Sequence, residues 1–318
     1  MLKNKTILIT GAAGFIGSHL TEILLKSGNF LILIDNFNEY YLGKEERLEA
    51  ILNNYQSDED YILIRDDITN KSFIDKIHHE IDYIFHLAAQ AGVRYSIEKA
   101  AEVSKNNIIS TINIFEYARK IDKIKKIVYA SSSSVYGNPI YTPCDEDHPK
   151  NPISPYAVSK LCGEIYANYY YREYNLPIVS LRFYTVYGPR GRPDMSISKF
   201  FNLMLNDKEI SIYGDGQQLR DFTYISDIIN GLILACEKDV SNGEIFNLGC
   251  SNPISVNNLI EKMYSIVNKP RKVKFIDKQQ GDVDITYSNI NKARTLLGYN
   301  PEINIEKGLM NYYNWRIK

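Results

Sequence analysis

Residues 6–17, TILITGAAGFIG, decide the fold of this chain. They begin with an apolar run of strand length, and Gly11, Gly14 and Gly17 follow at once, before a stretch with helical periodicity at 18–28. A strand, a glycine turn and a helix in this order bring backbone N–H groups and a helix N-terminus close to one point, which favours a pyrophosphate there. The spacing is one residue wider than the usual dinucleotide fingerprint, so the motif by itself also fits a glycine turn without a ligand.

Further apolar runs along the chain predict a parallel sheet. They are continuous rather than alternating and are separated by helix-length segments, as in a sheet that helices cover on both faces. We expect strands at 6–10, 30–34, 61–64, 83–88, 126–131 and 178–184. The predicted fold class is therefore α/β, with a doubly wound parallel sheet of Rossmann type.

The alternation of strands and helices ends near residue 185, where YGPRGRPD and YGDGQQ indicate loops. We therefore expect a smaller C-terminal lobe that binds the substrate. Residues 1–184, with about 219–236, are assigned to the dinucleotide-binding domain, and residues 185–218 and 237–318 to the lobe.

The composition disfavours several classes of function. The 37 basic and 38 acidic residues nearly cancel, so we expect neither nucleic acid nor a membrane surface as a partner. The apolar run 6–10 is too short for a signal peptide or a spanning helix, which predicts a soluble, cytoplasmic protein. The 4 cysteines and 5 histidines lack the spacing of a metal site or a disulfide framework, so neither is expected.

Acidic residues after the second and third apolar runs suggest how a dinucleotide is bound. Asp35 follows the second run, at the distance where a carboxylate accepts hydrogen bonds from the adenosine ribose. It would repel a 2′-phosphate, and no arginine follows to offset its charge, so the predicted cofactor is NAD rather than NADP. Asp67 and Ile68 could border the adenine. The alternative for Asp35 is a simple turn residue at the end of a strand.

Tyr156 and Lys160 lie one helical turn apart and form the candidate catalytic pair. The spacing alone is weak evidence, because the chain has 25 tyrosines and the same spacing recurs at Tyr40/Lys44 and Tyr95/Lys99. Ser154 is a natural N-cap and Pro155 a natural first helical residue, which places Tyr156 in the first turn of a helix. We expect the helix dipole and the Lys160 charge to lower the phenol pKa from its usual value of about 10, making Tyr156 a general base.

A run of serines, residues 131–134, follows the fifth predicted strand. This point is the carboxyl edge of the sheet, where ligands of such folds bind. The alternative is an ordinary polar loop. The buried strand before the serines and the tyrosine–lysine helix after them favour a site instead.

Several motifs in order carry a resemblance to a known family. They are GAAGFIG (11–17), the Asp35-Asn36 strand end, HLAAQAGVRYS (86–96), SSSSVYG (131–137), SPYAVSK (154–160), LRFYTVYGPRGRPDM (181–195), RDFTYISD (220–227), NLG (247–249) and QGDV (280–283). Over nearly its whole length the chain resembles the extended short-chain dehydrogenase/reductase family, which contains NAD-dependent epimerases and dehydratases. Within that family, HLAAQAGVRYS and the GRPDM segment are most similar to UDP-glucuronate 4-epimerases.

The resemblance implies roles for individual residues. Tyr156 would be the catalytic base, Lys160 its electrostatic partner and Ser132 the hydroxyl that relays or supports proton transfer at C4 of the sugar. Tightly bound NAD would contact Gly11, Gly14, Phe15, Ile16, Gly17, Asp35, Asn36, Asp67, Ile68, Leu87, Ala88, Ala89, Asn106, Tyr156, Lys160 and Tyr184. The UDP-sugar substrate would contact Arg94, Ser132, Ser133, Thr185, Arg192, Lys199, Tyr213, Arg220 and Asp282. A homodimer formed by helices near 97–121 and 154–174 is also implied.

The resemblance bears on the substrate as well. Arg192 would pair with a hexuronate carboxylate, which suits guanidinium geometry, although a solvated loop arginine is the alternative. Gln279 stands where UDP-glucose epimerases usually have arginine. The implied activity is a 4-epimerase that interconverts UDP-glucuronate and UDP-galacturonate through a 4-keto intermediate, with a UDP-glucose or UDP-N-acetylglucosamine 4-epimerase as the alternative. Ser288-Asn289 replaces the family's usual Ala-Asp, and the sequence does not decide the effect.

The serine run disfavours other activities of the family. Sequences of 4,6-dehydratases resemble STDEVYG, and Ser133 and Ser134 replace their Asp-Glu acid and base. Decarboxylases of UDP-glucuronate usually have glutamate at the position of Ser134. A catalytically silent NAD-binding protein would commonly have lost the Tyr156–Lys160 pair, which is intact here.

Overall fold

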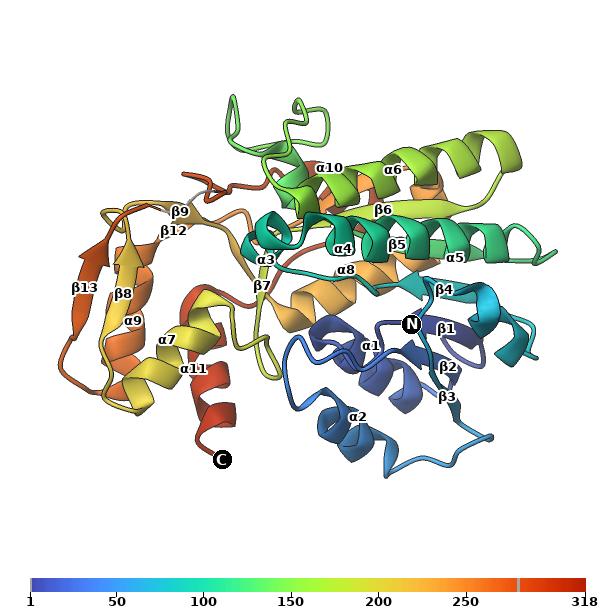
Figure 1. Cartoon of the computed structure of the whole chain (residues 1–318), viewed down its shortest axis with the longest axis horizontal. Coiled ribbons are helices and arrows are strands. Elements are labelled where there is room, and N and C mark those ends of the chain that lie inside the picture. Colours follow the sequence, from blue (N-terminus) through green and yellow to red (C-terminus); the bar gives the residue numbers. More distant parts are fainter. Residues whose placement is uncertain (1, 279–280) are drawn as a thin grey trace.

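The computed structural model describes residues 2–278 and 281–318, and its centre is the predicted parallel sheet (Figure 1). The described residues form a seven-stranded parallel sheet in the order β11–β6–β5–β4–β1–β2–β3. The strands expected from the apolar runs are confirmed: β1 (Thr6–Thr10), β2 (Phe30–Asp35), β3 (Tyr61–Arg65), β4 (Tyr83–His86), β5 (Lys126–Ser132) and β6 (Ile178–Phe183). The strand order reverses between β1 and β4, so the sheet is doubly wound and of Rossmann type.

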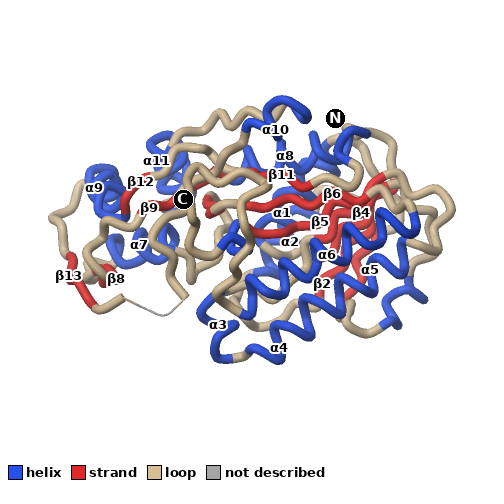
Figure 2. The backbone as a smooth tube through the Cα atoms, turned by 90° about the horizontal axis from the view of Figure 1, so that it is seen from above, coloured by secondary structure: helices blue, strands red, loops and turns tan. Residues whose placement is uncertain are grey.

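Helices cover both faces of the sheet, which explains why its strands are apolar throughout (Figure 2). Ile7 and Ile9 of β1 belong to the core on one face, whereas Leu8, between them, belongs to the core on the other. One face packs against α1 (Phe15–Lys26), α2 (Lys44–Leu52) and α8 (Ile225–Glu237), and the other against α5 (Ser110–Ala118) and α6 (Pro155–Tyr174). No helix in the described residues is long and apolar enough to span a membrane.

Short helical segments lead into α5 and lie beside α6 (Figure 2). They are α3 (Val93–Glu98), α4 (Ala100–Ser104) and the π-helical turn η2 (Lys105–Ile109). Single 3-10 turns occur elsewhere, at η1 (Lys71–Lys76), η3 (Ser133–Tyr136) and η4 (Asp239–Ser241). The π-helical turn contains Asn106, and such turns often mark functional positions because they redirect a side chain.

The seventh strand of the sheet, β11 (Ile245–Leu248), corrects the division of the chain made from the sequence. It pairs in parallel with β6, with Phe246 opposite Leu181, so it belongs to the sheet, although residues 237–318 are assigned to the lobe in the sequence analysis. The strand has only 4 residues, and the polar Asn247 lies within it. An apolar run therefore could not reveal it.

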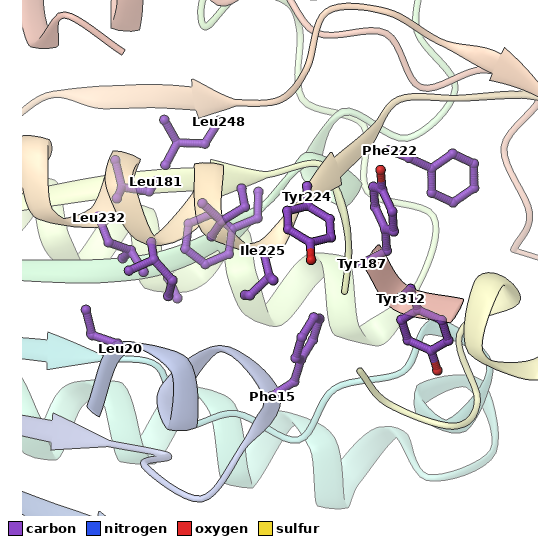
Figure 3. Close-up of a cluster of buried hydrophobic side chains, with 14 of the residues drawn as sticks. Phe15, Leu20, Leu181, Tyr187, Phe222, Tyr224, Ile225, Leu232, Leu248 and Tyr312 are labelled. Carbon is purple, nitrogen blue, oxygen red and sulfur yellow. The ribbon is translucent and has the colours of Figure 1, made fainter. Parts of the chain in front are cut away.

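The smaller lobe follows the end of β6 and packs against the sheet through a shared core (Figure 1). The remaining elements of the C-terminal part are β7 (Thr185–Tyr187), α7 (Ser196–Leu205), β8 (Ile210–Tyr213), β9 (Leu219–Arg220), β10 (Phe222–Tyr224), β12 (Ile254–Ser255), α9 (Val256–Val267), β13 (Val273–Ile276), α10 (Asn291–Leu297) and α11 (Ile305–Arg316). Phe15 of α1, Leu181 of β6, Tyr224 of β10 and Tyr312 of α11 belong to one buried cluster (Figure 3). The core is thus continuous from the sheet into the lobe.

A buried ion pair joins α6 to β6. Arg182 donates from Nε and Nη2 to the Glu164 carboxylate, at 2.9 and 2.7 Å, and the two side chains are only 0% and 3% exposed. Ser131 of β5 donates to Glu164 at 2.5 Å, and Arg182 Nη1 donates to the Tyr136 hydroxyl at 2.8 Å. The pair fixes the helix against the sheet, because separating it would leave two buried charges without partners.

We expect Arg182→Met to lower the free energy of unfolding by about 3–5 kcal/mol, because Glu164 would stay buried without its counter-charge. Urea denaturation followed by circular dichroism measures this loss. The matched control is Lys262→Met, which removes the more exposed pair Lys262–Glu306 and should cost less than about 1 kcal/mol. Equal losses in the two variants would contradict the structural role of the buried pair.

Candidate active site

A cavity of about 450 Å³ opens at the carboxyl edge of the sheet, beside the point where the strand order reverses. Ligands of doubly wound folds bind at this place. Every residue expected to contact the cofactor lines it: Gly11, Gly14, Phe15, Ile16, Gly17, Asp35, Asn36, Asp67, Ile68, Leu87, Ala88, Ala89, Asn106, Tyr156, Lys160 and Tyr184. The residues expected to contact the cofactor are spread over most of the first two hundred positions of the sequence, and the structure brings them together around one cavity.

The glycine turn between β1 and α1 lets the backbone approach a ligand closely. Gly11 has φ +72°, and a Cβ there would come within 2.8 Å of the Ala88 backbone. A Cβ on Gly17 would collide with the Gly11 carbonyl, so α1 can begin this close to β1 only with glycine at that position. The helix begins without a side-chain cap, as helices do that bind an anion through their first N–H groups. This geometry fits a dinucleotide pyrophosphate.

Asp35 is buried next to this turn. Its carboxylate accepts hydrogen bonds from the N–H groups of Ala13 and Phe37, at 3.0 and 2.8 Å. Burial raises the pKa of Asp35, although these bonds and the Lys44 charge oppose the change. The Tyr40/Lys44 spacing looks like a chance match in the sequence, yet both side chains line the cavity. Lys44 is thus a cation near Asp35 that sequence reasoning missed.

Helix α6 places the catalytic candidates as expected. Ser154 caps it, its Oγ accepting a hydrogen bond from the helix backbone at 3.2 Å, and Pro155 is its first residue. Tyr156 in the first turn and Lys160 one turn later both line the cavity. Lys160 Nζ donates to the Ala130 carbonyl at 2.7 Å and lies 6.0 Å from the centre of the Tyr156 ring.

The expected lowering of the Tyr156 pKa is wrong for the chain by itself. Burial raises the pKa of Tyr156, and the Arg192 charge and a hydrogen bond with Ser132 offset this only in part. Burial also lowers the pKa of Lys160 to about 7, so near neutral pH much of its charge is lost. The side chains of Tyr156 and Lys160 are both shielded from water. The loss of hydration therefore affects the pKa of Tyr156 more than the helix dipole and the Lys160 charge do.

The serine run supplies hydroxyls at the same end of the cavity. Ser132 Oγ accepts hydrogen bonds from the N–H and the Oγ of Ser134, at 3.1 and 2.9 Å. Ser132 also hydrogen-bonds Tyr156, and Ser133 lines the cavity beside it. A relay of a proton between Tyr156 and a bound sugar hydroxyl is geometrically possible through Ser132, whereas residues 133 and 134 offer no carboxyl group.

The expected substrate residues fall into two groups. Those that line the cavity are Ser132, Ser133, Thr185, Arg192, Arg220 and Asp282. Of the other described candidates, Arg94 pairs with the cavity residue Asp282 at 2.9 Å, whereas Tyr213 contacts Arg94, whose guanidinium lies 4.4 Å from the centre of the Tyr213 ring. Lys199 is exposed on α7 and does not line the cavity. Gln279, expected to favour a uronate, lies outside the described residues.

Arg192 is not a solvated loop arginine. Its side chain is 18% exposed and forms a two-bond ion pair with Asp194, at 3.0 and 2.6 Å. Its guanidinium carbon lies 5.6 Å from the centre of the Tyr40 ring. Asp194 was not among the candidate residues, because a carboxylate two positions further along an irregular loop gives no signal in the sequence.

The departure Ser288-Asn289 has a local explanation in Asp221, the neighbour of Arg220. The buried Asp221 carboxylate accepts hydrogen bonds from the Ser288 hydroxyl and, at 3.0 Å, from the Ser288 N–H. It also accepts bonds from the N–H groups of Cys250 and Ser251, at 3.0 and 3.1 Å. The Ser288 hydroxyl therefore helps to satisfy a buried carboxylate, which an alanine at this position could not do.

Several histidines and cysteines of the described residues are buried side chains: His86, His148, Cys144 and Cys236. No three or more His, Cys, Asp and Glu side chains gather there as a metal-binding group, and the four cysteines are free. His86 lies between the Thr10 and Thr111 hydroxyls, at 2.8 and 3.0 Å, and burial lowers the pKa of His86 to about 3. It is therefore a neutral hydrogen-bonding side chain under the sheet edge.

Comparisons with known proteins agree with this site. A family model described as GDP-mannose 4,6 dehydratase matches residues 8–312. A UDP-glucuronate 4-epimerase of Thermodesulfobacterium geofontis (strain OPF15) is 40% identical to the chain, over 97% of the chain and 95% of that protein. Among solved structures, the UDP-glucuronic acid 4-epimerase from Bacillus cereus in complex with UDP-glucuronic acid and NAD has a TM-score of 0.89 and 38% identity, covering 98% of each chain.

A second solved structure has a different sugar. The UDP-N-acetylglucosamine 4-epimerase from Methanobrevibacter ruminantium M1, in complex with UDP-N-acetylmuramic acid, has a TM-score of 0.91 and 32% identity, covering 99% of each chain. Both similarities extend over the sheet and the lobe alike. Together with the family model, which spans nearly every residue, they show that the chain belongs to the GDP-mannose 4,6 dehydratase family of NAD-dependent sugar-nucleotide epimerases and dehydratases.

Proposed function

We propose that this chain is an NAD-dependent 4-epimerase that interconverts UDP-glucuronate and UDP-galacturonate. The observation that carries the proposal is the arrangement of one cavity. The glycine cradle fits a dinucleotide, and Tyr156, Ser132 and Arg192 line the same cavity. The similarity to UDP-glucuronate 4-epimerases over the full chain supports the same activity.

The residues fit proton transfer at C4 of the sugar. NAD, when bound, supplies the reversible oxidation of that carbon, so there is no net redox change. Tyr156 accepts the proton of the C4 hydroxyl, directly or through Ser132, as C4 becomes a ketone. The 4-keto sugar then turns on its UDP group. Tyr156 returns the proton when C4 is reduced from the opposite face, which inverts C4.

A uronate makes a further demand, because its 4-keto intermediate is a β-keto acid. Loss of carbon dioxide requires the bond to the carboxylate to align with the π-system of the ketone. Arg192 can hold the carboxylate away from that alignment through two parallel hydrogen bonds, which a guanidinium forms readily. Arg192 would thus both recognise the carboxylate of the substrate and protect the keto intermediate against decarboxylation.

Dehydration and decarboxylation fit the site less well. A 4,6-dehydratase needs an acid and a base near the sugar, and the two residues after Ser132 are Ser133 and Ser134. Hydroxyl groups with unperturbed acidity cannot replace two carboxyl groups at neutral pH. The family contains both chemistries, so this local difference decides between them.

A UDP-glucose or UDP-N-acetylglucosamine 4-epimerase is the second candidate, and one observation favours it. Arg192 already has a carboxylate partner in Asp194, so the site is electrically balanced for a neutral sugar as well. The deciding experiment is incubation of the purified protein with UDP-glucuronate and, separately, with UDP-glucose, without added cofactor, followed by proton NMR of the C4 configuration. Formation of UDP-galacturonate from the first substrate supports the proposal, and turnover of UDP-glucose alone would replace it by the second candidate.

Tyr156→Phe should reduce turnover roughly 100- to 10,000-fold, because it removes the general base but leaves the ring in place. Isothermal calorimetry with UDP should give wild-type affinity, and the cofactor content of the purified variant should be unchanged. The matched control is Tyr141→Phe, at an exposed tyrosine in another loop, which should keep full activity. A near-normal rate for Tyr156→Phe would refute its role as the base.

Arg192→Met should reduce kcat/KM for UDP-glucuronate by roughly 10- to 100-fold, because it removes hydrogen bonds to a charged group and such bonds contribute a free energy of this size. Steady-state kinetics measures this change, while UDP alone should bind as tightly as to the wild type. Lys208→Met, which removes an exposed lysine in the segment between α7 and β8, is the control for loss of a positive charge. An equal change of kcat/KM in both variants would show that Arg192 does not contact the sugar.

We also propose a homodimer formed by the helices that lie beside and include α6. This face exposes apolar and aromatic side chains: Ile109, Val158, Ile165, Tyr166, Tyr169 and Tyr174. Burying such a patch against a second copy removes it from water.

The free thiols and the nucleotide ligands of the proposed reaction suit a reducing, cytoplasmic location.

Ile165→Glu should convert the proposed dimer into a monomer, because it places a charge in the middle of the apolar patch, where Ile165 is 62% exposed. Size-exclusion chromatography with light scattering measures the mass. Ile140→Glu alters a residue that is 77% exposed in a different loop and should leave the dimer intact. A wild-type protein that is monomeric would exclude the proposed assembly.

A further inference from the structure

Arg192, Asp194 and Tyr40 form a polar cluster at the cavity, which Arg192 and Tyr40 line. Arg192 donates from Nε to Asp194 Oδ1 at 3.0 Å and from Nη2 to Oδ2 at 2.6 Å, and the Tyr40 hydroxyl donates to Oδ2 at 3.2 Å. The arginine side chain is 18% exposed and the aspartate 43%. The carboxylate is therefore held by three hydrogen bonds, yet it can turn toward water more easily than the arginine can.

The cluster connects two sides of the cleft. Tyr40 belongs to the segment after β2, whereas Arg192 and Asp194 lie in the loop between β7 and α7. The ring of Tyr40 packs edge-on against Tyr95 of α3, with 5.0 Å between ring centres. Its hydroxyl lies so close to Gly92, whose φ is +112°, that a side chain there would not fit. These contacts hold Tyr40 where it can orient the aspartate.

Asp194 occupies only one edge of the guanidinium. Nε and Nη2 form this edge, and a second carboxylate can bind bidentately at the edge formed by the two terminal nitrogens. Arg192 also acts on the reaction centre, because its charge is the main influence that opposes the rise of the Tyr156 pKa. A carboxylate that binds Arg192 would therefore lie in the same cavity as Tyr156.

Epimerisation of a uronate requires this contact to be broken and remade. The ring must present its opposite face to the cofactor, so the carboxylate on C5 moves while the ketone is present. A largely buried guanidinium without any partner is unfavourable, so an arginine that held only the substrate would resist this motion. Asp194 supplies an alternative partner inside the same site.

We propose that Asp194 is an exchangeable counter-ion that holds Arg192 whenever the carboxylate of the substrate does not, both in the free enzyme and while the keto sugar turns. This inference rests on the proposed function. Tyr40 is a positioning residue that keeps Asp194 near the guanidinium. Binding of a uronate is then an exchange of one carboxylate for another, whereas a neutral hexose leaves the Arg192–Asp194 pair undisturbed.

The test compares Asp194→Asn with the wild-type holoenzyme. Without the competing charge, KM for UDP-glucuronate should fall by roughly 10-fold, and kcat should fall by a similar factor because the carboxylate is released more slowly. The near-ultraviolet absorbance of reduced nicotinamide should rise during turnover, since the keto intermediate accumulates. Tyr40→Phe should shift all three quantities in the same direction by less. Asp194→Glu keeps the charge and should restore kcat toward the wild-type value.

The controls separate this inference from the proposed function. Asp147→Asn neutralises an exposed aspartate far along the chain and should change none of the three quantities. If the wild type epimerises UDP-glucuronate but Asp194→Asn raises KM, or leaves the three quantities unchanged, the counter-ion exchange is refuted and the activity stands. If the wild type acts on UDP-glucose and not on UDP-glucuronate, the proposed substrate and the exchange fall together.

Discussion

The buried ion pair between Glu164 and Arg182 is the constraint on which the active site depends. Helix α6 carries Tyr156, Lys160 and Glu164 on one face, because they are spaced by four residues. Arg182 of β6 and Ser131 of the neighbouring strand β5 bind the third of them. The first two are thereby aligned along the edge of the sheet, where Lys160 also donates a hydrogen bond to the Ala130 carbonyl of β5 at 2.7 Å.

Close packing reinforces this alignment. A Cβ on Gly163 would overlap the Tyr129 hydroxyl, so α6 approaches β5 more closely than a helix with a side chain there could. Ser159 of the same helix donates to its own backbone and accepts a bond from Asn107 at 2.9 Å, which ties α6 to the π-helical turn η2. Asn106, the neighbour of Asn107, reaches the cavity from that turn. Helix, turn and sheet edge therefore form one rigid support.

The charges in the site are balanced in pairs rather than left free. Arg192 is matched by Asp194, Arg94 by Asp282, and Arg220 is held by the carbonyl groups of Leu219 and Val283 at 2.9 and 2.6 Å. Lys160 loses much of its charge to burial instead. Burial thus raises the pKa of the Tyr156 phenol in the chain alone, so a bound ligand that favours the phenolate would assist the proposed proton transfer.

The sequence was sufficient for the parts of the structure that local patterns encode. Six strands follow from continuous apolar runs, and the start of α6 follows from Ser154 and Pro155. Strand β11 was missed because 4 residues with a central asparagine have no periodicity to detect. Asp194 and the direction of the Tyr156 pKa could not be predicted, because both depend on burial and on contacts between distant segments.

The continuous core described above also decides how ligands enter and leave. Phe15 of α1 and Tyr312 near the C-terminus pack into the same apolar cluster, so the sheet and the lobe share a core that opposes their moving apart as separate bodies. We expect the cavity to open through surface segments, such as the one that carries Tyr40, and through separation of the exposed Arg94–Asp282 ion pair. Local motion of these segments would let a sugar nucleotide enter and leave without disturbing the shared core.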